Sequence, residues 1–250
     1  MEEPIVTLSS DFGLADAYVA ALKAAILRQA PTARLIDVTH HVSPGDVLGG
    51  SIVLERAVAA FGPGCVHLSV VDPGVGTSRR ILVVQIHRQM VVCPDNGLIT
   101  WAWRRLGRGK AHELTWRPRR ISRTFHGRDI MAPAAGMLAA GRPISQIARP
   151  IDTPLLLNVH LARCNARRGR IIHIDHFGNA MTNIPRQAMA GKRTVRVGKR
   201  RLRIAGTYAQ VPSGTPLALI ASADLLEIAV RDGSAAAVLA LHVGDEVMLE

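Results

Sequence analysis

Short apolar runs alternate with segments of helical spacing over the first 150 residues, and this alternation restricts the fold more than any other feature. In residues 14–29, apolar side chains recur every three or four positions, which is typical of a helix with one buried face. Strands that alternate with such helices form a mostly parallel sheet with helices on both faces. We therefore predict an α/β domain over residues 1–150. Its expected strands are 4–8, 33–38, 66–71, 81–86 and 90–92, the last two forming a hairpin, and its expected helices are 14–29, 47–61, 98–106 and 133–140.

The pattern changes after Pro150, where apolar segments become shorter and alternate with polar residues. Alternation with a period of two is typical of strands buried on one face. Residues 197–200 have the composition of a hairpin turn, and residues 233–241 that of a helix. We expect a smaller, antiparallel β-barrel-like domain over residues 155–250, with the boundary at 150–154. Its expected strands are 170–174, 194–197, 201–204, 216–220 and 246–249.

Composition excludes several classes of protein. Of the 250 residues, 48% are hydrophobic and 20% are charged, which excludes an intrinsically disordered chain. No apolar run approaches the roughly 18–20 residues of a membrane-spanning helix. The acidic start of the sequence lacks the basic and apolar regions of a signal peptide. We expect a soluble, cytoplasmic protein.

Cysteine and metal chemistry find little support. The three cysteines, Cys65, Cys93 and Cys164, are far apart, and none belongs to a C-x-x-C pair, so neither a disulfide framework nor a cysteine zinc site is indicated. Other potential ligands are not paired at helical spacing; they are His40, His41, Asp72, Asp95 and His126. We expect no metal ion and no cofactor.

The formal net charge of +12 raises the question of a nucleic-acid partner. Residues 101–128 carry nine basic side chains against one acid, Glu113, and residues 186–203 carry eight against none. Neither segment has a helix-turn-helix, zinc-finger or RNP-like pattern, or several interleaved aromatic side chains for base stacking. Because 27 of the 31 basic residues are Arg, a general bias of composition explains the charge better. We expect no nucleic-acid partner.

Two polar loops follow predicted strands of the first domain, where parallel sheets bind ligands. In Ser9–Gly13, the Asp11 carboxylate can accept hydrogen bonds from a vicinal diol such as a ribose, although its position alone favours the role of a helix N-cap. In residues 72–79, two glycines allow close approach of the backbone to a ligand, and Arg79 can fold back onto Asp72. A purely structural Asp–Arg ion pair is the alternative.

Two further loops carry chemically versatile side chains. His126 lies between Phe125 and Gly127 and can orient or transfer a proton, or serve only as a surface residue. In residues 175–179 of the second domain, Phe177 and Asn179 can stack on and hydrogen-bond an adenine, while Asp175 can hold an ammonium group. A β-bulge with a turn is the alternative for this loop.

Taken in order, the loops resemble one family, the S-adenosyl-L-methionine (SAM) hydrolases, also called SAM hydroxide adenosyltransferases, which are related to fluorinase and chlorinase. The segments that carry the resemblance are Ser10–Gly13, 71–77, 94–98, 125–129, 175–179, Leu225–Val230 and 233–236. They span nearly the whole chain. The resemblance implies a Rossmann-like α/β domain and a β-barrel-like domain. It also implies a homotrimer whose active sites lie at subunit interfaces, and the hydrolysis of SAM to adenosine and L-methionine.

Six substrate-binding residues follow from the resemblance: Asp11, Phe125, Asp175, Phe177, Asn179 and Ser222. By motif, Asp11 would bind the ribose hydroxyls, and Phe125 belongs to the motif that also contains His126. Phe177 would stack on the adenine and Asn179 would bind its edge. Asp175 would hold the methionine ammonium group. Ser222 would lie near the methionine carboxylate, although its neighbours depart from the commoner family pattern.

The resemblance further implies a catalytic group of Asp72, Arg79 and His126. The sulfonium of SAM is already a good leaving group, so no acid is needed to expel methionine. Water is a poor nucleophile and must be aligned with C5′, opposite sulfur. A carboxylate can accept the water proton while the arginine and histidine orient the water.

Two other functions compete with this interpretation. A halogenase of the same family would use halide in place of water, but this chain has Asp72 and Gly127 where fluorinase-like enzymes have Tyr and Ser. A carboxylate beside C5′ would repel an incoming anion. Residues 86–94 also leave no room for the loop insertion typical of those halogenases. From a different class, a non-catalytic module that binds SAM or adenosine is the second alternative.

Overall fold

The computed structural model describes residues 3–250, which divide into two compact units. One unit ends at Asn158, and the other comprises Val159–Glu250. Each has its own sheet and its own buried core.

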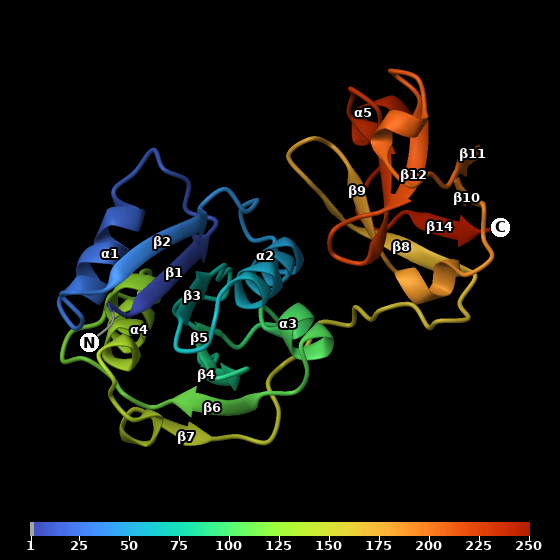
Figure 1. The fold of residues 1–250 in the computed structure, drawn as a ribbon. Helices are drawn as coiled ribbons and strands as arrows, with labels where there is room; N and C mark the ends of the chain where they lie inside the picture. Colours follow the sequence, from blue (N-terminus) through green and yellow to red (C-terminus); the bar gives the residue numbers. More distant parts are fainter. Residues whose placement is uncertain (1–2) are drawn as a thin grey trace. The chain divides into compact units, whose positions relative to one another are not determined.

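The first unit is built on a seven-stranded sheet with the order β2-β1-β3-β5-β4-β6-β7. Its strands are β1 (Ile5–Ser10), β2 (Arg34–Thr39), β3 (Val66–Val70), β4 (Ile81–Ile86), β5 (Gln89–Pro94), β6 (Lys110–Leu114) and β7 (Ala148–Pro150). The first four strands in this order pair in parallel, and the remaining pairs are antiparallel. The loops that follow β1, β2, β3 and β5 therefore leave the sheet at the same edge (Figure 1).

Helices cover both faces of this sheet (Figure 1). They are α1 (Tyr18–Leu27) and α4 (Ala132–Ala139) on one face, and α2 (Val47–Ala60) and α3 (Thr100–Arg105) on the other. The side chains of β4 alternate between the two layers, because Ile81 and Val83 join the core with α1 and α4 while Leu82 and Val84 join the core with α2 and α3. The predicted α/β fold class is confirmed.

A π-helix over Gly127–Met131 leads into α4. The backbone N–H of Ala132 donates to the carbonyl of Gly127, five residues earlier. Pro133 accounts for this wide turn, since it has no N–H and its ring would clash with the carbonyl of Asp129 in an α-helix. The widened turn begins directly after His126.

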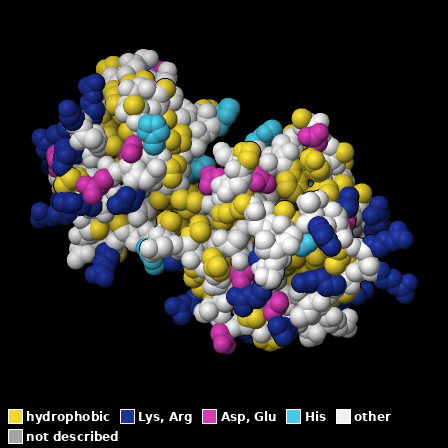
Figure 2. All heavy atoms as spheres, turned by 180° about the vertical axis from the view of Figure 1, so that it is seen from behind, with side chains coloured by type: hydrophobic (Ala, Val, Ile, Leu, Met, Phe, Trp, Pro, Cys, Tyr) yellow, Lys and Arg dark blue, Asp and Glu magenta, His cyan; other side chains and the backbone are white. Residues whose placement is uncertain are grey.

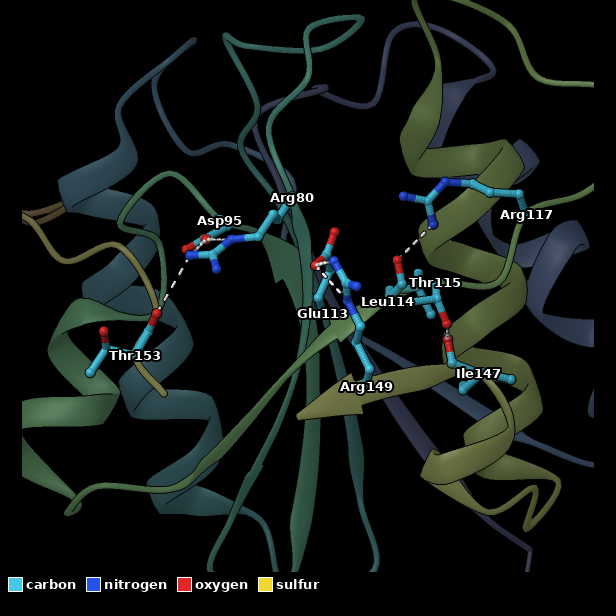
Figure 3. A network of polar contacts seen from close by, with 9 residues as sticks. All are labelled: Arg80, Asp95, Glu113, Leu114, Thr115, Arg117, Ile147, Arg149 and Thr153. Carbon is cyan, nitrogen blue, oxygen red and sulfur yellow. Dashed lines mark hydrogen bonds and ion pairs between the residues drawn. The ribbon is translucent and has the colours of Figure 1, made fainter. Parts of the chain in front are cut away.

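The chain remains attached to the first unit beyond β7 (Figure 3). Arg80 Nε donates to Asp95 Oδ2 at 2.7 Å, and Arg80 Nη2 donates to the carbonyl of Thr153 at 3.4 Å. Asp95 Oδ1 accepts the backbone N–H of Leu155 at 2.7 Å. The ion pair thus holds residues 153–155, which explains why the division between the units falls after Asn158.

The second unit has a seven-stranded sheet with the order β11-β10-β14-β8-β9-β13-β12. Its strands are β8 (Arg168–Ile174), β9 (Ala180–Pro185), β10 (Thr194–Val197), β11 (Arg200–Arg203), β12 (Pro216–Ile220), β13 (Leu225–Val230) and β14 (Glu246–Leu249). It has one α-helix, α5 (Ala235–Leu239), and two short 3₁₀ helices, Arg186–Met189 and Tyr208–Gln210. All pairs of strands are antiparallel. A bridge between Ile204 and Ala218 links the two edges, so the sheet nearly closes on itself. The predicted barrel-like fold is confirmed.

Four strands of the structure lie outside the predicted set. β6 and β7 are short strands at the edge of the first sheet, and β6 combines Lys110, His112 and Glu113 in five residues. β9 ends in a proline, and β13 is buried at all six positions, so neither shows clear alternation. The first helix begins at Tyr18, four residues later than expected, because Gly13 has a positive φ and its N–H donates to the carbonyl of His40.

The basic side chains do not form one continuous patch on the face drawn in Figure 2. On the face drawn in Figure 2, Lys and Arg side chains lie in several separate groups around the outer surface. Within residues 3–250, no group of three or more His, Cys, Asp or Glu side chains is placed to hold a metal ion. No helix in the described part of the chain is long and apolar enough to cross a membrane.

Candidate active site

Asp72 and Arg79 form a buried, bidentate ion pair in the loop that follows β3. Arg79 Nε donates to Asp72 Oδ1 at 2.6 Å, and Arg79 Nη2 donates to Asp72 Oδ2 in a shorter bond. The side chains are 5% exposed for Asp72 and 9% for Arg79. Arg79 therefore folds back onto Asp72, as the sequence suggested.

His126 completes a group of three with this ion pair. Its Nδ1 lies 3.3 Å from Arg79 Nη2. A guanidinium only donates hydrogen bonds, so His126 Nδ1 must be the acceptor. Burial of the ring, and next the charge of Arg79, lower the pKa of His126 below its ordinary value. The imidazole is thus neutral near pH 7 and carries its proton on Nε2.

The backbone holds the Asp72 loop in a fixed shape. The hydroxyl of Thr77 donates to the carbonyl of Gly74 at 2.7 Å. Gly76 has a φ of +83°, and a Cβ there would lie 2.6 Å from the carbonyl oxygen of Arg123. Only glycine fits this close approach, by which the Asp72 loop rests on the segment that leads to His126.

Asp11 lies at the same edge of the sheet, after the neighbouring strand β1. Ser10 of β1 pairs with Val70 of β3, so Asp11 and Asp72 follow adjacent strand ends. Asp11 Oδ2 accepts the backbone N–H of Gly45 at 2.9 Å. This bond orients a partly exposed carboxylate at the strand end next to that of Asp72.

Three aromatic side chains connect the Asp11 loop to the His126 loop. Phe12, Tyr18 and Phe125 stand edge to face, with ring centroids 5.4–5.9 Å apart. The guanidinium of Arg128 lies 4.8 Å from the ring centre of Phe125. Phe125 is therefore part of an apolar cluster next to His126, and packing fixes its ring.

In the second unit, Asp175 organises the loop between β8 and β9. Its Oδ1 accepts the backbone N–H groups of Phe177 at 2.9 Å and Asn179 at 2.8 Å, and its Oδ2 accepts the Asn179 amide at 3.2 Å. Gly178 has a φ of +82° and packs so tightly on Ser234 that any Cβ would collide with it. These contacts hold the loop in one conformation.

An open cavity of about 720 Å³ lies beside this loop. It is lined by Phe177, Asn179, Tyr208, Ala209, Val230, Arg231, Asp232, Gly233 and Ser234. The Phe177 side chain is 74% exposed, an unusual state for a phenylalanine. An exposed aromatic ring beside a cavity is typical of a site for a flat ligand.

Tyr208 is a cavity residue that the sequence analysis missed. Its hydroxyl donates to the buried Glu227 at 2.8 Å. Burial, and next the bond to Glu227, raise the pKa of Tyr208 to about 12, so the phenol stays neutral and donating. Its only sequence signal is rarity, because the chain contains two tyrosines.

The structure does not bring Ser222 to this cavity within one unit. Ser222 lies in the turn between β12 and β13, whereas Val230, which lines the cavity, ends β13. The six residues of β13 separate the two ends by about 17 Å. Ser222 therefore stands apart from Phe177 and Asn179.

Models of protein families match both units. The chain matches the SAM hydroxide adenosyltransferase N-terminal domain over residues 6–148 and the SAM hydroxide adenosyltransferase C-terminal domain over residues 169–248.

Curated relatives and a solved structure agree with these models. An (R)-S-adenosyl-L-methionine hydrolase of Thermus thermophilus is 40% identical, over 96% of this chain and 97% of that protein. One of Salinispora arenicola is 39% identical, over 98% and 97%. A crystal structure of an uncharacterized conserved protein from Thermotoga maritima has a TM-score of 0.92 at 36% identity and covers 98% of this chain and all of that one.

Fluorinases are more distant relatives. One from an Actinoplanes species is 26% identical over 73% of this chain and 72% of its own length. The matches thus favour the hydrolases over the halogenases.

Proposed function

The chain belongs to the SAM hydroxide adenosyltransferase family, and on this premise we propose that it hydrolyses S-adenosyl-L-methionine to adenosine and L-methionine. The observation that carries the proposal is the group formed by the buried Asp72–Arg79 ion pair and the half-buried His126 at the carboxyl edge of the parallel strands. A water molecule beside this group would face reactive groups whose positions are already fixed.

The reaction is a displacement at C5′ of the adenosyl group. The oxygen of water forms a bond to C5′ while the C5′–S bond breaks, and the bonding pair moves to sulfur as methionine leaves. The water loses one proton. Since the leaving group becomes a neutral thioether, catalysis depends on alignment of the water and acceptance of its proton.

Asp72 is the acceptor of that proton in this mechanism. Both of its oxygens accept bonds from Arg79, which fixes the plane of the carboxylate. Each oxygen keeps a further lone pair for water.

His126 is a donor in this mechanism and does not act as the base. Its Nδ1 accepts from Arg79, so Nε2–H is the side of the ring that remains for the water oxygen. A donor to a lone pair of the water holds the other lone pair in line with C5′. Phe125 fixes one wall next to this group.

In our proposal, the second unit supplies the side chains that bind the adenine and the methionine ammonium group of SAM. Phe177 stacks on the adenine, and Tyr208, which lines the same cavity, contacts the ligand in this proposal. Because a carboxylate only accepts, the Asn179 amide must turn its NH₂ toward Asp175, and its oxygen is left to accept from the adenine amino group. Asp175 retains lone pairs for the methionine ammonium, and Asp11 binds the ribose hydroxyls.

The assembly is also part of the proposal. We propose a homotrimer with active sites at subunit interfaces and a cytoplasmic location. Support comes from the division of the proposed binding groups between two units. Light scattering with the purified chain would measure the number of subunits.

The experiment that tests the function follows the products formed from SAM in oxygen-18 water. We expect equimolar adenosine and methionine, with the label at the 5′-oxygen of adenosine. Label in methionine would overturn the displacement at C5′, and binding without turnover would make the chain a SAM-binding module. Addition of chloride or fluoride should leave adenosine as the main product, because Asp72 is anionic and the turn between β4 and β5 has only two residues, His87 and Arg88.

The names of the curated relatives specify the (R) form of the substrate. We extend this preference to the present chain. Separate assays with the (R) and (S) sulfonium epimers would test it, and equal kcat/KM for the two would contradict it.

A further inference from the structure

His40 connects three elements underneath the Asp11 loop. It follows β2 directly and is only 2% exposed. Its Nδ1 lies 2.7 Å from the hydroxyl of Ser10, at the end of β1, and its Nε2 lies 3.1 Å from Asp37 Oδ1. Asp37 in turn accepts from Lys23 of α1 at 2.6 Å. The imidazole thus joins β1 to an ion pair between β2 and α1.

The hydrogen bonds of this chain of residues converge on the Asp37 carboxylate. Burial alone would raise the pKa of Asp37, but hydrogen bonds from Lys23 and His40 hold it below the ordinary value, so this carboxylate only accepts. His40 therefore carries a proton on Nε2. Ser10 Oγ accepts the N–H of Phe12 at 3.3 Å and can donate its own proton to Nδ1. Ser10 is fully buried, which excludes it as a nucleophile.

The backbone of the loop that contains His40 forms hydrogen bonds to residues on both sides of Asp11. The carbonyl of His40 accepts the N–H of Gly13 at 2.7 Å. The N–H of Val42 donates to the carbonyl of Ser10 at 3.3 Å, and the N–H of Gly45 donates to Asp11 Oδ2 at 2.9 Å. The loop after β2 therefore contacts the residue before Asp11, a residue shortly after it, and the Asp11 carboxylate.

We propose that His40 is a positioning residue for substrate binding, which holds the Asp11 carboxylate at the angle that the two ribose hydroxyls require. This inference rests on the proposed function, because it assumes that Asp11 binds the ribose. His40 touches neither the substrate nor the water in this scheme. Its loss should therefore change KM much more than kcat.

A second buried histidine in the same sheet is a matched control. His67 Nδ1 lies 2.7 Å from the hydroxyl of Thr7 in β1, and the side chain is 1% exposed. Its Nε2 lies 2.5 Å from Gln89 Oε1. It resembles His40 in burial and in its bond to a β1 hydroxyl, but Thr7 is in the interior of β1, four residues from Asp11.

The test compares variants of the two histidines with intact SAM and with 2′-deoxy and 3′-deoxy analogues. For His40→Ala we expect KM for SAM to rise about five- to tenfold, no more than for loss of the Asp11 carboxylate that it positions, with kcat within about threefold. His40→Asn, which keeps an acceptor near the Nδ1 position, should recover most of the loss. His67→Gln should change thermal stability but leave KM within about twofold. The deoxy analogues should be nearly insensitive to His40→Ala.

A double variant separates positioning from general damage to the fold. In an Asp11→Asn background, His40→Ala should raise KM by less than about threefold, since the carboxylate that it positions is gone. A full additional loss in that background would overturn the proposal. So would an equal rise in KM for His67→Gln, or an unchanged KM for both His40→Ala and His40→Asn. If Asp11→Asn alone left KM unchanged while SAM was still hydrolysed, the role of His40 would be overturned and the proposed function would stand.

Discussion

The two units hold their functional side chains in different states. In the first, Asp72, Arg79 and His126 are largely buried and bonded to one another, so their geometry is set before any ligand arrives. In the second, Asp175 fixes its loop through backbone bonds, but the Phe177 ring on that loop is 74% exposed beside an open cavity. In the first unit the charged side chains are already paired, whereas in the second unit an apolar ring is exposed to solvent.

This difference indicates a division of work. Preorganised charges lower the barrier of a chemical step, because they need no rearrangement during the reaction. An exposed ring and a cavity gain free energy only when a ligand covers them. Changes in the first unit should therefore act mainly on kcat, and changes in the second mainly on substrate affinity.

The largest expected effect belongs to Asp72. For Asp72→Asn we expect kcat to fall by about 10²–10⁴, the usual range for loss of a positioned base, with Kd for SAM within a few-fold. The amide has nearly the same shape but cannot accept the proton of water. Product chromatography gives kcat, and calorimetry gives Kd.

Asp95→Asn is the matched control for this variant. Asp95 pairs with Arg80, the neighbour of Arg79 in the chain, and holds the backbone of Leu155. It should lower thermal stability and leave kcat within a few-fold. If Asp72→Asn weakened SAM binding and retained kcat at saturation, the assignment of proton acceptance to Asp72 would be wrong.

The next largest effect concerns Phe177. Phe177→Ala should weaken SAM binding by about 1–3 kcal/mol, or about five- to 150-fold in Kd, if stacking on adenine resembles stacking on nucleic-acid bases. The exposed Val243 of the same unit offers a control, and Val243→Ala should leave Kd unchanged. A loss of kcat at saturation in Phe177→Ala, with Kd intact, would contradict the division between the units.

Asp11 sharpens the comparison because we propose it as a binding residue in the unit that carries the proposed catalytic group. Asp11→Asn should raise KM by about tenfold and change kcat less, since a ribose clamp acts in both the ground state and the transition state. Steady-state kinetics suffice for this measurement. A fall in kcat as large as that of Asp72→Asn would place Asp11 in the chemical step.

The smallest effect is a pH dependence that comes from His126. Burial and Arg79 lower its pKa, so the neutral form persists below its ordinary value of about 6.5. Protonation would remove the acceptor that faces Arg79, so kcat should be constant above about pH 6.5 and fall as pH drops through the lowered pKa.

The free energy of unfolding should also decrease as the pH falls, because the pKa of His126 is lowered in the folded state. A histidine whose pKa is lower in the folded state contributes stability that is complete above its unfolded pKa and is lost as pH falls. Denaturant titrations of the chain and of His126→Gln at pH 7.5 and pH 5 would measure this difference. A variant with the same pH dependence as the parent chain would show that His126 does not titrate in this range.

The sequence predicted those parts of the molecule that depend on local pattern. The parallel strands and their helices follow from apolar spacing, and the contact between Arg79 and Asp72 follows from their positions in one glycine-containing loop. β6, which lies next to the edge strand β7, was missed because a five-residue strand with Lys110 and Glu113 has no apolar pattern to detect. The spacing of apolar residues does not reveal short polar strands near the edge of a sheet.

The contacts of the second unit show the other limit of sequence reasoning. Tyr208 lines the same cavity as Phe177 although about thirty residues separate them, and no spacing rule connects a single-turn helix to a β-hairpin loop. The use of Asp175 as the organiser of its own loop was also not foreseen, because its backbone bonds depend on the positive φ of Gly178. The roles of the site residues stay predictions until the variants are measured.

The π-helix before α4 gives the direction of His126 an unusual origin. Each residue of an α-helix turns the chain by about 100° around the helix axis, and the wide turn of Gly127–Met131 accommodates one residue more than an α-helix would. His126 directly precedes this wide turn, so the extra residue changes the direction in which the His126 side chain leaves the helix axis. In the structure the ring faces Arg79. Deletion of one residue from this turn would rotate His126 by about 100° while α4 kept its own packing. The orientation of the His126 side chain thus depends on the number of residues in the turn that precedes α4.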